Sequence, residues 1–172
     1  MKLLADLIRA VADFPSAGVT FRDITPLLAD AQGFALCLDQ LAEDWQGYAL
    51  NAVCAVEARG FIFGGALAER LGVGFVPLRK PGKLPPPVVA LDYDLEYASD
   101  RLELRANTLP PGARVILVDD VLATGGTLVA ARTLVEQCGA RVLGASVVVE
   151  LEALGGRARW GEALPLHSLL RY

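Results

Sequence analysis

Apolar residues recur along this chain with two spacings that alternate from one segment to the next. Short, continuous apolar runs are typical of buried strands, and they cover residues 52–56, 74–78, 115–118 and 141–151. Apolar positions three and four residues apart predict helices over residues 2–12, 33–44, 61–71 and 127–138. Strands that alternate with helices favour a mostly parallel, twisted sheet with helices on both faces. We therefore expect an α/β fold.

Two segments near the ends of the chain depart from this alternation. Residues 14–24 hold too many turn formers for a core element. We expect them to belong to a small N-terminal hood, about residues 12–30, that could cover a flat base. The tail, 153–172, is expected to be irregular. No repeat or linker divides the sequence, so residues 1–172 are predicted to form one domain.

A long, proline-rich insertion follows the second predicted strand, over residues 79–103. We expect a hairpin around residues 93–104. Insertions of this length in compact domains are usually lids or binding loops, so a mobile lid is predicted over about residues 81–102. The first part of the insertion is either a solvated loop or a clamp for pyrophosphate. Its three cations are Arg79, Lys80 and Lys83.

Composition limits the kinds of partner and compartment. Of the 172 residues, 53% are hydrophobic and 21% are charged, which is typical of a globular protein. The net charge of −4 argues against a nucleic-acid partner. No apolar run reaches the roughly 18 residues of a membrane span. The start of the chain has no signal-peptide pattern, and the three cysteines show no metal-ligand spacing. We expect a cytoplasmic protein with buried thiols.

The loop after the third predicted strand has the composition of an anion cradle. Its glycines let the backbone come close to a ligand, and free N–H groups at the start of the next helix point at an anion. The threonine hydroxyls add further donors. A solvated strand-to-helix turn is the alternative, since these are ordinary turn residues. The loop residues are Ala123, Thr124, Gly125, Gly126 and Thr127.

Two adjacent carboxylates, Asp119 and Asp120, precede that loop. They would repel a bare phosphate, but they could bind a metal-bridged phosphate or accept hydrogen bonds from sugar hydroxyls. A ribose phosphate satisfies both demands. In open α/β sheets the ligand lies beyond the carboxyl ends of the strands. Three strand ends carry chemistry here: residues 57–60, residues 79–80 and residues 119–120.

Five motifs resemble those of the adenine phosphoribosyltransferases, in the same order and at about the same spacing. They are residues 21–26, 57–64, 79–85, 93–97 and 119–127, and the resemblance covers roughly residues 12–151. It implies a type I phosphoribosyltransferase fold and a purine salvage enzyme. Such an enzyme transfers the phosphoribosyl group of 5-phosphoribosyl 1-pyrophosphate to adenine, with Mg²⁺, and gives AMP and pyrophosphate. The transition state would resemble an oxocarbenium ion. A homodimer is also implied.

The resemblance assigns the donor's parts to particular residues. Asp119 and Asp120 would hold the ribose hydroxyls, in part through the metal, and the loop 123–127 would cradle the 5′-phosphate. Arg59 would form the pyrophosphate loop with its neighbours Glu57, Ala58 and Gly60. In this family that loop holds a strained, often cis, peptide, which here would join Glu57 and Ala58. Arg79, Lys80 and Lys83 would meet the pyrophosphate, some of them across the dimer interface.

The base and the proton transfer are assigned by the same resemblance. Thr20 and Arg22 stand where the hood reads adenine, largely through backbone groups. Glu96 would aid proton transfer at adenine N7, and Tyr97 beside it would contact the substrate.

Two other readings of function stay open. One is transfer to another base, such as guanine or xanthine. The other is a non-catalytic regulator that senses the donor or a purine. We expect His167, Trp45 and Trp160 to serve packing, and leave Glu150 and Glu152 unassigned.

Overall fold

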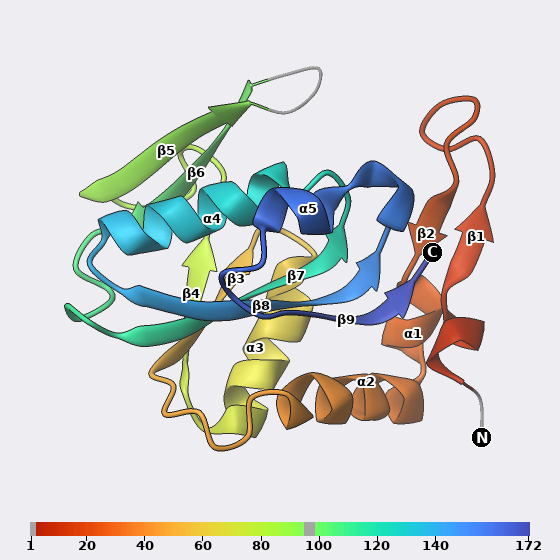
Figure 1. Cartoon of the computed structure of the whole chain (residues 1–172), viewed down its shortest axis with the longest axis horizontal. Coiled ribbons are helices and arrows are strands. Elements are labelled where there is room, and N and C mark those ends of the chain that lie inside the picture. The colour runs from red at the N-terminus through yellow and green to blue at the C-terminus, as the bar shows by residue number, and fades with distance from the viewer. Residues whose placement is uncertain (1–2, 95–98) are drawn as a thin grey trace.

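A five-stranded parallel sheet forms the centre of the molecule (Figure 1). The computed structural model describes residues 3–94 and 99–172. Every pair of neighbouring strands in this sheet is parallel, so their carboxyl ends meet at one edge. The spatial order is β4 (Gly74–Leu78), β3 (Ala52–Val56), β7 (Arg114–Leu122), β8 (Arg141–Glu150) and β9 (Leu166–Arg171).

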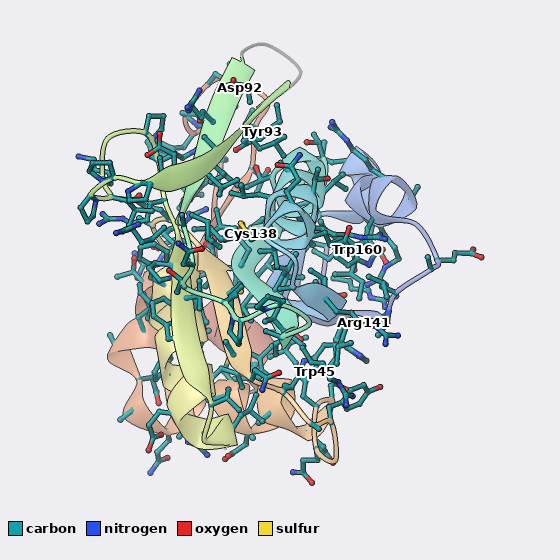
Figure 2. All side chains as sticks on the ribbon, turned by 90° about the vertical axis from the view of Figure 1, so that its left-hand side faces the viewer. Trp45, Asp92, Tyr93, Cys138, Arg141 and Trp160 are labelled. Carbon is teal, nitrogen blue, oxygen red and sulfur yellow. The ribbon has the colours of Figure 1, made fainter. Side chains whose placement is uncertain are left out.

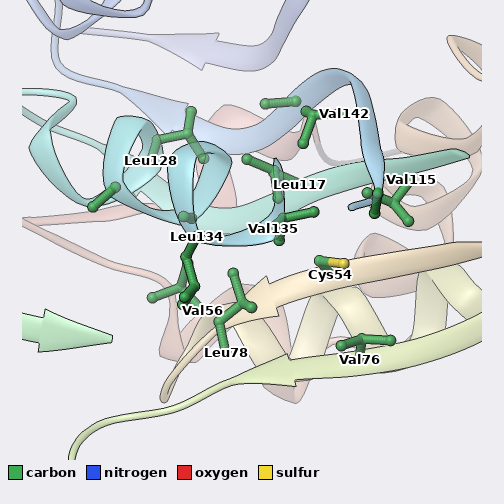
Figure 3. Close-up of a cluster of buried hydrophobic side chains, with 14 of the residues drawn as sticks. Cys54, Val56, Val76, Leu78, Val115, Leu117, Leu128, Leu134, Val135 and Val142 are labelled. Carbon is green, nitrogen blue, oxygen red and sulfur yellow. The ribbon is translucent and has the colours of Figure 1, made fainter. Parts of the chain in front are cut away.

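Helices cover both faces of the sheet, as the sequence predicted. The helices α2 (Ala31–Glu43) and α3 (Gly60–Leu71) lie on one face, and α4 (Gly126–Gln137) and α5 (Gly156–Trp160) lie on the other. Strand β3 is buried on both sides, because Ala52, Cys54 and Val56 face α4 while the residues between them face α2 and α3. Figure 3 shows the apolar cluster on the α4 side.

The N-terminal segment differs from its prediction. Residues 2–12 were expected to be helical, but the described part forms one 3₁₀ turn, η1 (Leu4–Leu7), and the strand β1 (Arg9–Val11). The buried residues Leu4 and Leu7 need only that single turn, and β1 then pairs antiparallel with β2 (Phe21–Asp23). The predicted hood is therefore a two-stranded ribbon followed by α1 (Thr25–Ala29).

The predicted hairpin exists and starts earlier than expected. It consists of β5 (Val88–Asp94) and β6 (Ser99–Arg105). Leu102 and Leu104 are fully buried in the core cluster on the α4 side. Within the segment expected to be a mobile lid, residues 88–94 and 99–102 thus belong to a strand pair packed against α4.

Two further expectations were wrong. Strand β7 does not end at Val118 but continues through Leu122, which pairs with Glu150, so Asp119 and Asp120 lie within the strand. The tail is not irregular, because it holds η2 (Glu152–Leu154), α5 and the edge strand β9. An edge strand is buried on fewer sides than a central one, so the apolar pattern of β9 was too weak to reveal it.

The aromatic and thiol side chains that were expected to serve packing do so. Trp45 is buried and donates from Nε1 to Ser146 Oγ at 2.7 Å. The ring of the single histidine, His167, meets Trp45 edge-on, with 5.1 Å between centroids. Burial raises the pKa of the Cys37 and Cys54 thiols to about 12, and nearby Cys138 adds to the effect at Cys54. These two thiols are therefore unreactive at neutral pH.

Trp160 closes the other face of the sheet in a similar way. It is buried, and its Nε1 donates to the Leu164 carbonyl oxygen at 3.0 Å. Figure 2 shows Trp45 and Trp160 well apart in the molecule. Among residues 3–94 and 99–172, no helix is long and apolar enough to cross a membrane.

Candidate active site

The three strand ends that carry chemistry meet around one cavity. Its volume is about 260 Å³. The lining combines the turn after β3, Lys80 shortly after β4 and the end of β7, so parallel pairing brings together segments far apart in the sequence. The lining residues are Val56, Glu57, Ala58, Arg59, Lys80, Asp119, Asp120, Val121, Ala123 and Thr127.

A second, adjoining cavity of about 150 Å³ lies over the loop between β7 and α4. It is lined by residues 121–128 together with Asp119 and Val147. Gly125 has φ of +79°, the left-handed conformation that favours glycine, and α4 begins at Gly126. The N–H groups of the first turn of α4 are therefore free to bind an anion in this cavity.

Helix α5, which the sequence did not predict, shapes the anion loop (residues 123–127). A Cβ on Gly125 would lie 2.6 Å from the carbonyl oxygen of Gly156, so the helix packs directly on the loop. Glu150 holds α5 in place, because Arg157 donates to its carboxylate at 2.9 and 2.6 Å. The hydrogen bond from Arg157 also lowers the pKa of Glu150 despite burial. Glu150, unassigned from sequence, thus supports the anion loop indirectly, through Arg157 and α5.

The two carboxylates at the end of β7 have different surroundings. Asp119 Oδ1 accepts from the backbone N–H of Asp120 at 2.9 Å. Asp120 is buried, and its Oδ2 lies 2.9 Å from Arg59 Nε. Burial, followed by the charge of Asp120, raises the pKa of Asp119 well above its ordinary value. Burial also raises the pKa of Asp120, but the charge of Arg59 opposes that rise.

Gly60 allows α3 to begin close to these acids. A Cβ at this position would lie 2.9 Å from Asp119 Oδ1 and 3.1 Å from the Val118 carbonyl oxygen. Glycine therefore fits here where a larger residue would push the turn after β3 away from β7. The peptide bond between Glu57 and Ala58 in the same turn is cis, as the resemblance implied.

Glu57 organises the basic segment after β4. Its carboxylate accepts from Arg79 at 3.0 and 3.2 Å and from the backbone N–H of Lys80 at 2.8 Å. The hydrogen bond from Arg79 is the main cause of the lowered pKa of Glu57. Arg79 also donates to the Lys83 carbonyl oxygen at 3.1 Å. Of the three cations expected to meet pyrophosphate, only Lys80 lines the cavity, while Arg79 shapes the turn and Lys83 is exposed.

The hood reaches the site through Phe21. The guanidinium carbon of Arg59 lies 5.5 Å from the centre of the Phe21 ring. Arg22 points elsewhere, with its guanidinium carbon 3.9 Å from the centre of the ring of Tyr172, the residue after β9. Side chains alternate along a strand, so Arg22 turns away where Phe21 turns in. Reading of the base by Thr20 and Arg22, expected largely through backbone groups, stays a prediction. Phe21 was not assigned to the site, although this aromatic residue was visible in the sequence.

Arg159 on α5 was also missed. A Cβ on Gly126 would lie 3.0 Å from Arg159 Nη1, which places this guanidinium beside the first turn of α4. The tail was expected to be irregular, so no residue there was assigned to the site. Glu96 and Tyr97, which were assigned, lie outside the described residues.

Comparison with known proteins agrees with this geometry. The family model for the phosphoribosyl transferase domain matches residues 23–162. The adenine phosphoribosyltransferase of Xanthomonas campestris pv. campestris (strain B100) is 54% identical over 165 residues, 96% of this chain and 89% of its own. A crystal structure of adenine phosphoribosyltransferase from Thermoanaerobacter pseudethanolicus matches with a TM-score of 0.94, 44% identity and 98% coverage of both chains. The enzyme of Giardia lamblia, crystallised with 9-deazaadenine, matches with a TM-score of 0.92 and 38% identity, over 98% of this chain and 96% of its own.

The fold is thus that of a type I phosphoribosyltransferase. Within that class, the chain belongs to the adenine phosphoribosyltransferase family.

Proposed function

We propose that this chain transfers the phosphoribosyl group of 5-phosphoribosyl 1-pyrophosphate to adenine, giving AMP and pyrophosphate. One observation carries the proposal: an anion loop, two adjacent carboxylates and two cations line adjoining cavities. A ribose with a phosphate at one end and a pyrophosphate at the other matches that order of groups. The choice of adenine rests on the relatives, which include an enzyme crystallised with 9-deazaadenine.

The proposed reaction breaks the bond between C1′ and the pyrophosphate oxygen and forms a bond between C1′ and adenine N9, which loses its proton. Positive charge develops on the ribose ring, as in an oxocarbenium ion. The carboxylates of Asp119 and Asp120 favour that charge electrostatically and accept hydrogen bonds from the ribose hydroxyls. Arg59 and Lys80 stabilise the departing pyrophosphate, and the α4 N-terminus holds the 5′-phosphate. Glu96 assists the proton transfer at the base.

Mg²⁺ fits the chemistry of this site. Carboxylate oxygens are ligands that Mg²⁺ prefers, and Asp119 and Asp120 supply them. Residues 3–94 and 99–172 contain no group of three His, Cys, Asp or Glu side chains that could hold a metal ion alone. The donor's own oxygens would therefore supply much of the coordination. Bound there, the ion would neutralise charge on the pyrophosphate.

We also propose that two copies of the chain associate through the edge of the sheet at β4. Ile62 on α3 and Phe75 on β4 are 41% and 38% exposed, respectively. Phe61 and Phe75 are in ring contact, with 5.7 Å between centroids, so the apolar surface is continuous. Strand β4 also has an open edge. Light scattering should give the mass of a dimer, and Phe75→Glu should give a monomer.

We propose a cytoplasmic location as well. The described cysteine thiols are all free, which is consistent with a reducing compartment.

Equilibrium titration with three ligands tests the assignment of the cavities. AMP and ribose 5-phosphate should both bind, because each places a phosphate on the anion loop. Adenosine should bind at least about tenfold more weakly than AMP, since it lacks the charged contacts. Filter binding with DNA at low salt tests the alternative of a regulator. Retention of DNA together with no response to AMP would contradict the proposed function.

A further inference from the structure

The hairpin β5–β6 contacts residues of both cavities. Asp100 on β6 forms an ion pair with Lys80 Nζ, and Lys80 lines the larger cavity. Tyr93 on β5 donates from its hydroxyl to the same oxygen, Asp100 Oδ2, at 2.9 Å. The Tyr93 hydroxyl also lies 3.5 Å from Thr127 Oγ1, on the anion loop. Tyr93, labelled in Figure 2, is the direct cross-strand partner of Asp100.

Backbone contacts fix Asp100 relative to Lys80. Strand β6 is joined to the end of β4 by two hydrogen bonds between Arg79 and Glu103, at 2.9 and 2.8 Å. The other carboxylate oxygen of Asp100 accepts from the Arg101 backbone N–H at 2.8 Å. The ion pair is therefore held by the frame of the sheet and the hairpin. It is not a chance meeting of two mobile surface side chains.

Lys80 and Asp100 each shift the pKa of the other. Burial by itself would lower the pKa of Lys80, but the hydrogen bond and charge of Asp100 raise it above its ordinary value. Burial would raise the pKa of Asp100, but the hydrogen bonds from Lys80, Arg101 and Tyr93 lower it. Both groups are ionised at neutral pH, so the cation that lines the cavity already has an anionic partner.

We propose that Asp100 is a positioning residue that competes with pyrophosphate for Lys80, and so weakens the hold of the enzyme on the pyrophosphate group. The inference rests on the proposed function, which puts pyrophosphate beside Lys80. The Lys80 ammonium has three donors, so it can contact both anions, but the Asp100 carboxylate repels a polyanion placed against the same cation. Because pyrophosphate departs as a separate product, weaker retention favours its release.

Tyr93 moderates this competition. Its hydroxyl donates to the oxygen that also accepts from Lys80, so it stabilises part of the charge of Asp100. Without that hydroxyl, the carboxylate would rely more on Lys80 and hold it more tightly. Loss of the Asp100 charge and loss of the Tyr93 hydroxyl should therefore shift pyrophosphate binding in opposite directions.

Calorimetric titration of the whole protein with inorganic pyrophosphate tests the proposal. Asp100→Asn keeps the size and an acceptor oxygen but removes the charge, and should lower the Kd for pyrophosphate about threefold, in keeping with a partly exposed ion pair. Tyr93→Phe should raise that Kd about twofold. The gain in Asp100→Asn should shrink as salt is added. The Kd for AMP, which lacks the pyrophosphate, should change less than twofold in either variant.

Asp92→Asn is the matched control. Asp92 lies on the same hairpin, is paired with Arg101, and has a side chain that is 73% exposed. Its substitution should leave the Kd for pyrophosphate unchanged. An unchanged or higher Kd for pyrophosphate in Asp100→Asn, or an equal fall in the Kd for AMP, would overturn the role of Asp100. Failure of the unaltered protein to bind pyrophosphate at all would instead overturn the proposed function.

Discussion

Asp119→Asn should make the protein more stable and less active, and the gain in stability should depend on pH. Asp119 carries a raised pKa because it is buried next to the charge of Asp120. Each pKa unit of difference between the folded and unfolded states corresponds to about 1.4 kcal/mol. Asparagine keeps an oxygen that can accept from the Asp120 N–H but carries no charge.

The sign of the pH effect follows from the direction of that pKa shift. Below the ordinary carboxyl pKa of 3.8, Asp119 is neutral in both states and costs nothing. As pH rises from there through the folded pKa, the unfolded state releases its proton more readily, and the protein with Asp119 loses stability. The advantage of Asp119→Asn should therefore grow with pH and become constant above the folded pKa.

Urea denaturation between pH 5 and pH 9 measures this difference directly. We expect the Asp119→Asn variant to be more stable by at least about 1 kcal/mol at pH 8, and its kcat to fall about 100-fold through loss of charge stabilisation at the ribose. Asp92→Asn, at an exposed position, should show neither effect. A variant that is less stable at pH 8, or a difference that does not change with pH, would refute the reasoning.

Three further variants test other parts of the site. Gly125→Ala should lower the free energy of unfolding by about 1–2 kcal/mol and weaken AMP binding, because φ at this position is +79° and the new Cβ would meet Gly156. Thermal denaturation measures the first effect, and titration with AMP measures the second. Arg159→Ala should raise the steady-state KM for the donor about threefold with kcat unchanged, whereas exposed Arg141→Ala, at the opposite end of the sheet, should not. Glu96→Gln should lower kcat more than it raises KM for adenine in the same assay, and an unaltered kcat would remove Glu96 from catalysis.

The central sheet could be predicted because burial on both faces leaves a strong signal in the sequence. Residues 52–56 are apolar without interruption, and the structure buries every one of them. The anion loop was equally visible, because glycine at φ of +79° and a helix start at Gly126 need residues that few other turns combine. Local requirements of this kind can be read without knowing the rest of the fold.

Elements held by distant contacts could not be read in the same way. Leu4 and Leu7 have helical spacing, but the helix ends after a single turn because the next residues pair with β2. Strand β9 exists because β8 offers an open edge, and its own apolar pattern is weak. The placement of Arg159 beside the anion loop depends on that second pairing, since Arg157 on the same helix donates to the carbonyl oxygen of Leu166 on β9.

Side-chain direction was a second limit. Arg79 was expected to meet pyrophosphate, but the carboxylate of Glu57, 22 residues earlier, engages its guanidinium. Spacing along the chain gave no sign of that pair. Phe21 was missed for a related reason, since only the pairing of β1 with β2 decides which face of the ribbon turns toward Arg59.

The most direct test of the central claim is AMP formation from adenine, 5-phosphoribosyl 1-pyrophosphate and Mg²⁺, with guanine, hypoxanthine and xanthine assayed in parallel. We predict turnover with adenine and at least about 100-fold lower kcat/KM with each other base. Comparable turnover with another base would contradict the assignment of the hood to adenine. The absence of turnover with any base, from folded protein, would contradict the proposed reaction itself.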